Sequence, residues 1–308
     1  MVIVRLMGGM GNQMFQYAMA RTLAYKHGTQ LFIDNSLCPE TERNNSSGLT
    51  LRPYGLDVFN VQGQILTGEK FFKTIKIRKE NKLRRIAAIK LCQIVNMFFS
   101  SWRVCITERK DVSYDYSLLS LPDDIILQGY FPSYKYFIET EDIIRQDFIF
   151  KPEPDKENKT VISSISACNS VSVHFRLGDY VSNDKTNDKF GICNMSYYKN
   201  AIEYINKKVK EPRFFIFTND PEYVKSNLKI NYPSVYITHN SGCKNYEDMR
   251  LMSLCKHNII ANSSFSWWAA WLNENPDKIV ISPSPAFNEE VLTDMDYYPD
   301  DWILLPKC

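Results

Sequence analysis

"SVSVHFRLGDYV" (Ser170–Val181) is the stretch that decides the fold. It begins as an apolar β-strand that runs to Val173, as expected for a strand buried within a sheet. His174, Arg176 and Asp179 then follow within six residues, and Gly178 lets the chain bend. This strand end is either a solvated turn or a binding site for an anion.

The same pattern continues toward the C-terminus. Apolar, strand-like segments alternate with segments of helical spacing, which predicts a doubly wound parallel α/β sheet. The predicted strands are 171–175, 213–218, 234–238, 258–261 and 278–282, and the predicted helices are 196–209, 245–257, 263–273 and one that begins at Asp220 and Pro221. Ligands of such a sheet bind at the carboxyl ends of the strands.

The N-terminus opens with a βαβ pattern of its own. Residues 2–6 predict a strand and residues 7–11 a glycine-rich turn. Asn12 is the expected N-cap of a helix that ends at Gly28. A strand at 31–34 follows after a short connection, so the two strands should be parallel.

Two domains are expected, 1–155 and 156–308. The segment Lys151–Thr160 is rich in proline and charge, which is typical of a linker. Between the first βαβ pattern and this linker we predict irregular structure at 36–69, a basic helical region at 70–100 and a strand at 123–131.

Composition excludes several classes of protein. A net charge of +2 over 308 residues argues against a protein that coats nucleic acid. Eight cysteines without a CxxC pair, and only four histidines, make a zinc site unexpected. The Asp294-Met295-Asp296 triplet follows no predicted strand, so we expect no bound metal. Without a signal peptide or a long apolar run, the chain should be cytoplasmic, with free thiols.

A basic run covers residues 70–90. It holds nine Lys and Arg residues against one acid, Glu80, with apolar residues interleaved. Such a helix either lies on an anionic membrane surface or presents a solvated face, and the two interpretations have equal weight.

Polar residues follow most of the predicted strands and should converge at one edge of a sheet. These groups are Gly8–Gln13, His174–Asp179, Asn219–Asp220, His239–Asn240 and Asn262–Ser266. Arg176 and the helix start at Ser263–Ser266 together suit an anionic ligand, because a guanidinium can fork across two phosphate oxygens and a helix N-terminus favours negative charge. The alternatives are simple N-capping by the serines and a salt bridge from Arg176 to Asp179. Trp267, Trp268 and Trp271 are interpreted as core residues.

The first glycine-rich turn invites comparison with a dinucleotide-binding fingerprint. Gly9-x-Gly11 follows a strand, and Asp34 ends the next strand where a ribose-binding acid belongs. Met14, however, stands where close packing requires Gly or Ala, which disfavours an NAD site. The glycine-rich turn at residues 7–11 can still be interpreted as one that a phosphate or a sugar approaches closely.

Four segments together resemble the α-1,2-fucosyltransferases, glycosyltransferase family 11. They are "GGMGNQMFQYA" (Gly8–Ala18), "HFRLGDY" (His174–Tyr180), "FTND" (Phe217–Asp220) and "NSSFSWWAAWL" (Asn262–Leu272), in the family's order. The resemblance implies a GT-B-like fold of two Rossmann-type domains facing a cleft, the N-terminal one on the acceptor side and the C-terminal one binding the donor. It also implies GDP-β-L-fucose as donor, a galactose-terminated oligosaccharide or lipid-linked glycan as acceptor, and inversion without metal or cofactor.

The resemblance also assigns residues. His174 and Arg176 would contact the diphosphate, Asp248 would read guanine, and the serine motif would hold phosphate. The full set of expected donor-binding residues is Gly9, Gly11, Asn12, Gln13, Asp220, Asp248, Ser263, Ser264, Phe265 and Ser266. Asp179 and His174 are the candidate catalytic bases, and the departing diphosphate is a third acceptor for the proton. Acceptor specificity should lie in residues 36–69 and in the loop Tyr130–Phe137.

Two other functions remain open at this stage. One is a nucleotide-sugar-binding protein without catalysis, and the other is an NAD-dependent oxidoreductase. The intact His174-x-Arg176 pair argues against the first, and Met14 argues against the second.

Overall fold

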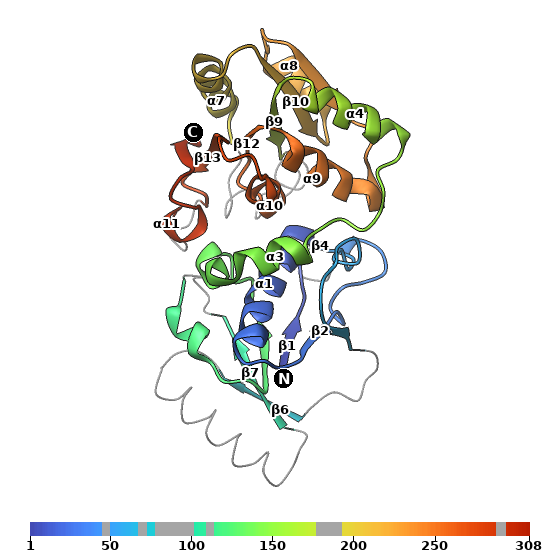
Figure 1. Ribbon diagram of the computed structural model, residues 1–308, viewed down its shortest axis with the longest axis vertical. Coiled ribbons are helices and arrows are strands. Elements are labelled where there is room, and N and C mark those ends of the chain that lie inside the picture. Colours follow the sequence, from blue (N-terminus) through green and yellow to red (C-terminus); the bar gives the residue numbers. More distant parts are fainter. Residues whose placement is uncertain (45–49, 67–72, 78–101, 109–113, 177–192, 288–293) are drawn as a thin grey trace. The chain divides into compact units, whose positions relative to one another are not determined.

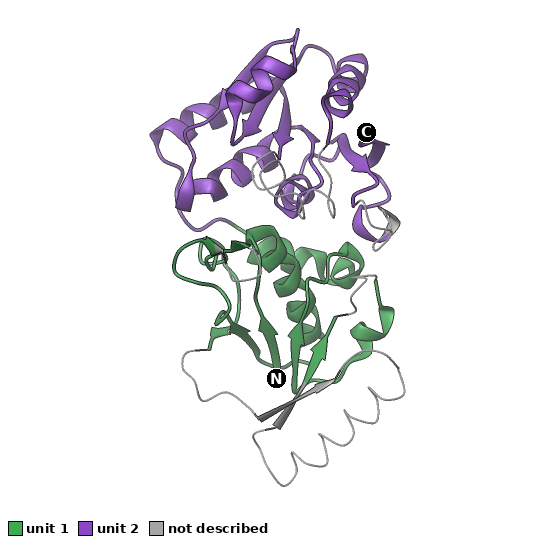
Figure 2. Ribbon diagram, turned by 180° about the vertical axis from the view of Figure 1, so that it is seen from behind, with its two compact units in different colours: residues 1–149 green, residues 150–308 purple. Residues whose placement is uncertain are grey.

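The structure, a computed structural model, describes the chain apart from residues 45–49, 67–72, 78–101, 109–113, 177–192 and 288–293. The chain divides into two compact units, Met1–Ile149 and Phe150–Cys308, which Figure 2 shows in green and purple. Each unit is an α/β structure built on its own parallel sheet.

The sheet of the first unit has the strand order β5-β2-β1-β8-β7-β6. Its strands are β1 (Val2–Arg5), β2 (Leu31–Asp34), β5 (Gln64–Ile65), β6 (Lys73–Ile77), β7 (Trp102–Thr107) and β8 (Ile125–Gln128). All neighbours pair in parallel, as predicted for β1 and β2. A short antiparallel pair, β3 (Arg43–Asn44) with β4 (Thr50–Leu51), stands apart from this sheet.

Helix α1 (Met10–Lys26) connects β1 to β2 and is buried on most of its surface. It ends where predicted, since Gly28 has a φ of +56°, a conformation that glycine adopts without strain. The predicted N-cap was wrong: the cap is Gly9, and Asn12 lies inside the first turn.

The basic region was also predicted incorrectly in part. Residues 73–77 form strand β6 and residues 102–107 form strand β7, which pair with each other. Most of the run 70–90 lies outside the described residues, so membrane contact there stays a prediction from the sequence. In the part of the chain that the structure describes, no helix combines the length and apolar character needed to span a bilayer.

The rest of the first unit consists of short helices. They are the 3-10 helices η1 (Tyr116–Ser120), η2 (Tyr134–Tyr136) and η3 (Ile138–Thr140), and helix α3 (Glu141–Asp147). Asp147 joins α3 to α1, since its Oδ2 accepts hydrogen bonds from the Tyr17 hydroxyl at 2.6 Å and from Arg21 Nε at 2.8 Å.

The sheet of the second unit has the order β11-β10-β9-β12-β13-β14. Its strands are β9 (Asn169–Phe175), β10 (Pro212–Thr218), β11 (Ser234–Ile237), β12 (His257–Ile259), β13 (Val280–Ser284) and β14 (Ile303–Pro306). All pair in parallel, as predicted, although β14 was not foreseen. The order of connection reverses between β9 and β12, which makes this the switch point of a Rossmann sheet.

Helices cover both faces of this sheet (Figure 1). They are α4 (Lys156–Ser166), α7 (Met195–Lys208), α8 (Pro221–Asn227), η4 (Gly242–Lys244), α9 (Asn245–Leu254), α10 (Ser264–Leu272) and α11 (Asp294–Tyr297). The second half of the predicted linker therefore belongs to α4, whose N-cap is Asp155.

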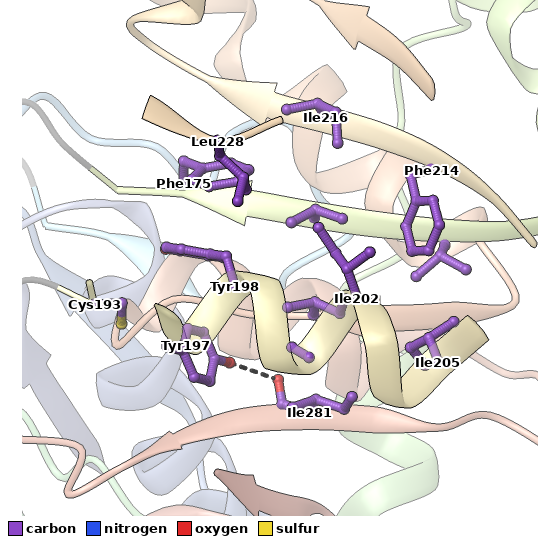
Figure 3. Close-up of a cluster of buried hydrophobic side chains, with 14 of the residues drawn as sticks. Phe175, Cys193, Tyr197, Tyr198, Ile202, Ile205, Phe214, Ile216, Leu228 and Ile281 are labelled. Carbon is purple, nitrogen blue, oxygen red and sulfur yellow. Dashed lines mark hydrogen bonds between the residues drawn. The ribbon is translucent and has the colours of Figure 1, made fainter. Parts of the chain in front are cut away.

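Alternate residues of β9 separate the two faces. Val171, Val173 and Phe175 belong to the cluster beneath α7 (Figure 3). On the opposite face, Ser172 accepts a hydrogen bond from Asn258 Nδ2 at 2.8 Å, and the same amide reaches the carbonyl of Met252 in α9 at 2.9 Å. Side chains on that second face, His174 included, therefore lie on the side of α9 and α10.

The tryptophans of α10 are core residues, as predicted. Trp267 and Trp268 are fully buried and Trp271 nearly so. Trp267 Nε1 donates to the carbonyl of Tyr297 at 2.9 Å, and its ring lies 5.4 Å from that of Trp302. This cluster fixes α10 against the C-terminal segment.

Candidate functional site

The switch point of the second sheet brings together two of the polar groups found in the sequence. His174 and Arg176 stand at and just beyond the carboxyl end of β9. Asn262 and Ser263 follow β12, the neighbouring strand, and lead directly into α10. In open parallel sheets, ligands bind in the crevice at this point.

Helix α10 has its N-terminus at this switch point. Ser263 is the N-cap, and its hydroxyl accepts a hydrogen bond from the backbone N–H of Phe265 at 3.3 Å. Ser263 and Ser264 are partly exposed, whereas Ser266 is buried and its hydroxyl lies within 3.4 Å of the carbonyls of Ala261 and Ser263. The Ser266 hydroxyl thus bonds the backbone inside the protein, and the serines of this group with exposed surface are Ser263 and Ser264.

His174 is buried beside this helix start. Its ring lies 5.8 Å from the ring of Phe265, and its carbonyl accepts a hydrogen bond from the Tyr198 hydroxyl at 3.1 Å. Burial, and then the cationic Arg176, lower the pKa of His174 to about 3. The imidazole is therefore neutral, and its buried Nδ1 has no hydrogen-bond partner among the described residues.

Asp248 belongs to a separate polar network on α9. Asn240 Nδ2 donates to Asp248 Oδ1 at 2.9 Å and to Asn158 Oδ1 at 3.0 Å. Burial raises the pKa of Asp248 to about 7, although the hydrogen bond from Asn240 acts in the opposite direction. This network joins α4, the loop after β11 and α9.

Asp220 serves as the N-cap of α8. Its Oδ1 accepts a hydrogen bond from the Tyr223 backbone N–H at 2.9 Å, and Pro221 occupies the first helical position, as the sequence indicated. It stands at the end of β10, one strand away from the switch point.

Four expected donor-binding residues, Gly9, Gly11, Asn12 and Gln13, lie in the first unit. Gln13 is fully buried and its amide is used internally. Its Nε2 donates to the carbonyls of Gly8 at 2.9 Å and Pro53 at 2.8 Å, and its Oε1 accepts from the N–H of Gly55 at 2.9 Å. Gln13 thus ties the loop at 53–55 to the start of α1.

Asp34, the acid considered for an NAD site, accepts hydrogen bonds from other residues of the protein. Asp34 Oδ2 accepts from Arg5 Nε at 2.7 Å, and Oδ1 accepts from the N–H of Ser36 at 3.0 Å. Partial burial opposes ionisation, but the hydrogen bonds from Ser36 and Arg5 prevail and lower the pKa of Asp34. Asp34 therefore braces β1 against β2.

Asp179 lies outside the described residues. Within the described ranges, no three His, Cys, Asp or Glu side chains group closely enough to hold a metal ion.

Sequence reasoning missed a cluster at the carboxyl ends of β7 and β8 in the first sheet. The Glu108 carboxylate, after β7, accepts hydrogen bonds from the N–H groups of Tyr130 and, at 2.7 Å, of Phe131, after β8. Gly129 permits this approach, since a Cβ there would lie 2.3 Å from Glu108 Cβ. The glycine at a strand end was the available signal.

Comparisons with known proteins agree on one family. The model of Glycosyl transferase family 11 matches residues 1–306. The Alpha-1,2-colitosyltransferase of Escherichia coli is 31% identical over 321 residues, covering 99% of each chain. The Galactoside alpha-(1,2)-fucosyltransferase 1 of Saimiri boliviensis boliviensis is 24% identical over 154 residues, 47% of this chain and 42% of the relative.

Among solved structures, a mutant of Arabidopsis thaliana FUT1 in complex with GDP superposes with a TM-score of 0.53. It is 11% identical, and the match covers 97% of this chain and 74% of that one. This similarity concerns the fold alone. Together with the two parallel sheets, it confirms the predicted GT-B-like pair of Rossmann-type units.

Proposed function

The chain belongs to glycosyltransferase family 11, and from this premise we propose that it transfers L-fucose from GDP-β-L-fucose to the 2-hydroxyl of a terminal galactose. The transfer inverts the anomeric carbon. The acceptor is an oligosaccharide or lipid-linked glycan, as in surface-glycan synthesis. The similarity to an α-1,2-colitosyltransferase and to a galactoside α-(1,2)-fucosyltransferase supports the linkage and the sugars.

One observation carries the donor site. A buried imidazole nitrogen without a partner among the described residues lies beside Arg176 and the start of α10, at the switch point of the sheet. Buried polar atoms are nearly always hydrogen-bonded, so an unsatisfied one at this position favours a ligand. We assign the diphosphate of the donor to this position.

The proposed chemistry is stabilisation of the leaving group. As the bond between fucose and the diphosphate breaks, negative charge grows on the departing GDP. The guanidinium of Arg176 can fork across two of its oxygens, and the partly exposed Ser263 and Ser264 stand at the positive end of α10. Charge stabilisation of this kind contributes about 10²–10³ in rate.

The proton of the attacking hydroxyl needs an acceptor. His174 is a poor base, because burial lowers its pKa to about 3. We therefore assign His174 a hydrogen bond to the donor, with the neutral ring held by Phe265. The proton goes to Asp179 or to the departing diphosphate.

The acceptor side of the proposal rests on the first unit. Tyr130 is exposed at the carboxyl end of β8, next to the glycine turn after β1. Its backbone is fixed by Glu108, so the ring is a preorganised surface for the apolar face of galactose. Residues 36–69 remain the second proposed determinant of acceptor choice.

A release assay tests the proposal. GDP formation from GDP-fucose is measured in EDTA with lactose, with N-acetyllactosamine and without acceptor. We expect release that depends on acceptor and persists in EDTA. Binding of GDP-fucose without release, over a broad acceptor panel, would instead identify a non-catalytic binding protein.

Colitose is the second candidate donor sugar, because a full-length relative is named for it. Colitose is L-fucose without the 3-hydroxyl, so the same assay with its GDP derivative compares the two donors. A site that hydrogen-bonds the 3-hydroxyl should reject the deoxy sugar by about 10⁴ in kcat/KM. A ratio in favour of colitose would reassign the donor and leave the linkage unchanged.

A further inference from the structure

We propose that Asn240 positions the Asp248 carboxylate for recognition of guanine, holding one of its oxygens so that the other faces the base. The inference rests on the proposed function, together with the guanine-reading role that the family resemblance implies for Asp248. It adds a specificity-determining residue from a different element, the loop after β11.

The orientation of the Asn240 amide is set by its partners. Asn240 Nδ2 donates to Asp248 Oδ1 at 2.9 Å and to Asn158 Oδ1 at 3.0 Å. In return, Asn240 Oδ1 accepts from Asn158 Nδ2 at 3.0 Å. A flipped Asn240 amide would turn its oxygen toward the carboxylate, so the reciprocal pair fixes the N–H on the side of Asp248.

Asn158 anchors this pair in α4. It is fully buried, and its N–H and Nδ2 both donate to Asp155 Oδ1 at 3.0 Å. His239 Nε2 lies 3.0 Å from Asn158 Oδ1. The arrangement is therefore held from three elements, which is what a preorganised site requires.

Asp248 has one oxygen to offer. Its Oδ1 is bound by Asn240, while Oδ2 has no hydrogen-bond partner in the described part of the chain. Asp248 is partly buried, and the two lone pairs of Oδ2 can accept both N–H groups of a ligand that carries them side by side. Guanine presents N1–H and its 2-amino group side by side, whereas hypoxanthine lacks the amino group and xanthine has a carbonyl there.

The charges around Asp248 make this recognition sensitive to pH. Burial raises the pKa of Asp248 to about 7, and Glu247 adds to the rise. The other ionisable groups near the network are Arg250, paired with Glu247, Lys244, paired with Asp155, and His239, which lies 3.6 Å from Glu157. Removing the Asn240 amide should raise the pKa of Asp248 further, because its N–H stabilises the charged form.

Calorimetry of nucleotide binding at pH 8 tests the role of Asn240. We expect Asn240→Ala to lower GDP affinity by about 10-fold and to reduce the preference for GDP over IDP. Loss of GDP binding on acidification should also begin at a higher pH than in the wild type. Asn227→Ala is the matched control, because that exposed amide bonds only the carbonyl of Tyr223, at 2.8 Å in α8.

A variant that gains affinity for a different nucleotide must be folded, so its result cannot be explained by misfolding. In Asp248→Asn, the oxygen of the substituted amide should stay on Asn240, which leaves its NH₂ group facing the base. That variant should prefer XDP to GDP, and adding Asn240→Ala should erase the preference. Asp248→Asn that binds neither nucleotide, or still prefers GDP, would contradict the assigned geometry.

The outcomes separate the two levels of the proposal. A wild-type protein that binds no GDP would overturn the proposed function itself. A wild type that binds GDP, together with Asn240→Ala showing unchanged GDP affinity and GDP-to-IDP ratio, would overturn the role of Asn240 alone.

Discussion

Arg176 and His174 stand two residues apart at the end of β9 but contribute differently to the proposed site. Arg176 carries a permanent charge, and that charge helps to keep the buried His174 neutral. A neutral imidazole can donate or accept one directed hydrogen bond without adding charge to the site. The electrostatic part of the proposed catalysis therefore belongs to Arg176 and to the start of α10.

Replacement of Arg176 tests this division. Arg176→Ala should lower kcat by about 10²–10³, and Arg176→Lys should recover only part of it, because an ammonium cannot fork across two oxygens. Steady-state kinetics with GDP-fucose measure the effect, and circular dichroism checks the fold. Arg213→Ala is the control, since Arg213 lies at the amino end of β10, over the Phe215 ring. Equal losses in both variants would contradict the assignment.

At this scale the sequence predicted the residues that local rules govern. Asp220 could be foreseen as an N-cap because Pro221 follows it, and His174 and Arg176 because they end an apolar strand. Asn158 could not be foreseen, because its partner Asn240 lies 82 residues away in the chain. The internal engagement of Ser266 depends on the path of the backbone before α10, which sequence alone does not give.

At the scale of elements, the approach of β7 to β8 depends on one glycine. A Cβ on Gly129 would lie 2.3 Å from Glu108 Cβ, and Glu108 cannot withdraw without giving up two backbone N–H groups. Gly129→Ala should therefore lower the free energy of unfolding by about 1–3 kcal/mol, as overpacking does.

Chemical denaturation measures that loss. Gly9→Ala supplies the comparison, since Gly9 also follows a strand of this sheet but a Cβ there meets no atom within 4 Å. We expect Gly9→Ala to cost only about 0.5 kcal/mol, because alanine caps α1 less well than glycine but meets no steric clash. If Gly129→Ala were as stable as Gly9→Ala, the ends of β7 and β8 would be able to move apart without lowering the free energy of unfolding.

Elements with regular apolar spacing were predicted well, and those with mixed signals were not. The strands and helices from β9 to β13 follow the expected order, because strand and helix periodicity alternate clearly there. Strand β6 was missed because basic residues interrupt its apolar ones in a way that also fits a helix. Strand β14 was missed because it is short and ends at a proline.

At the scale of the whole molecule, the sequence predicted two parallel sheets but not the strand order of the first. There, β5 and β6 follow each other in the chain yet form opposite edges of the sheet. The sequence does not predict this placement of β5 and β6, because strand order depends on which strands pair across long separations in the chain. In the second unit, regular βα alternation predicted a doubly wound parallel sheet, and the structure has one with the Rossmann strand order.

The aromatic cluster around α10 has a consequence for spectroscopy. Four of the five tryptophans, Trp267, Trp268, Trp271 and Trp302, belong to the second unit, and the fifth, Trp102, lies in β7 of the first. Intrinsic emission therefore reports mainly on the second unit, whereas far-ultraviolet circular dichroism reports on both. GDP at about 100 times its Kd should stabilise the emitting unit by about 2.7 kcal/mol. Denaturation curves with GDP should then shift in emission more than in dichroism, and equal shifts would mean that both units unfold as one.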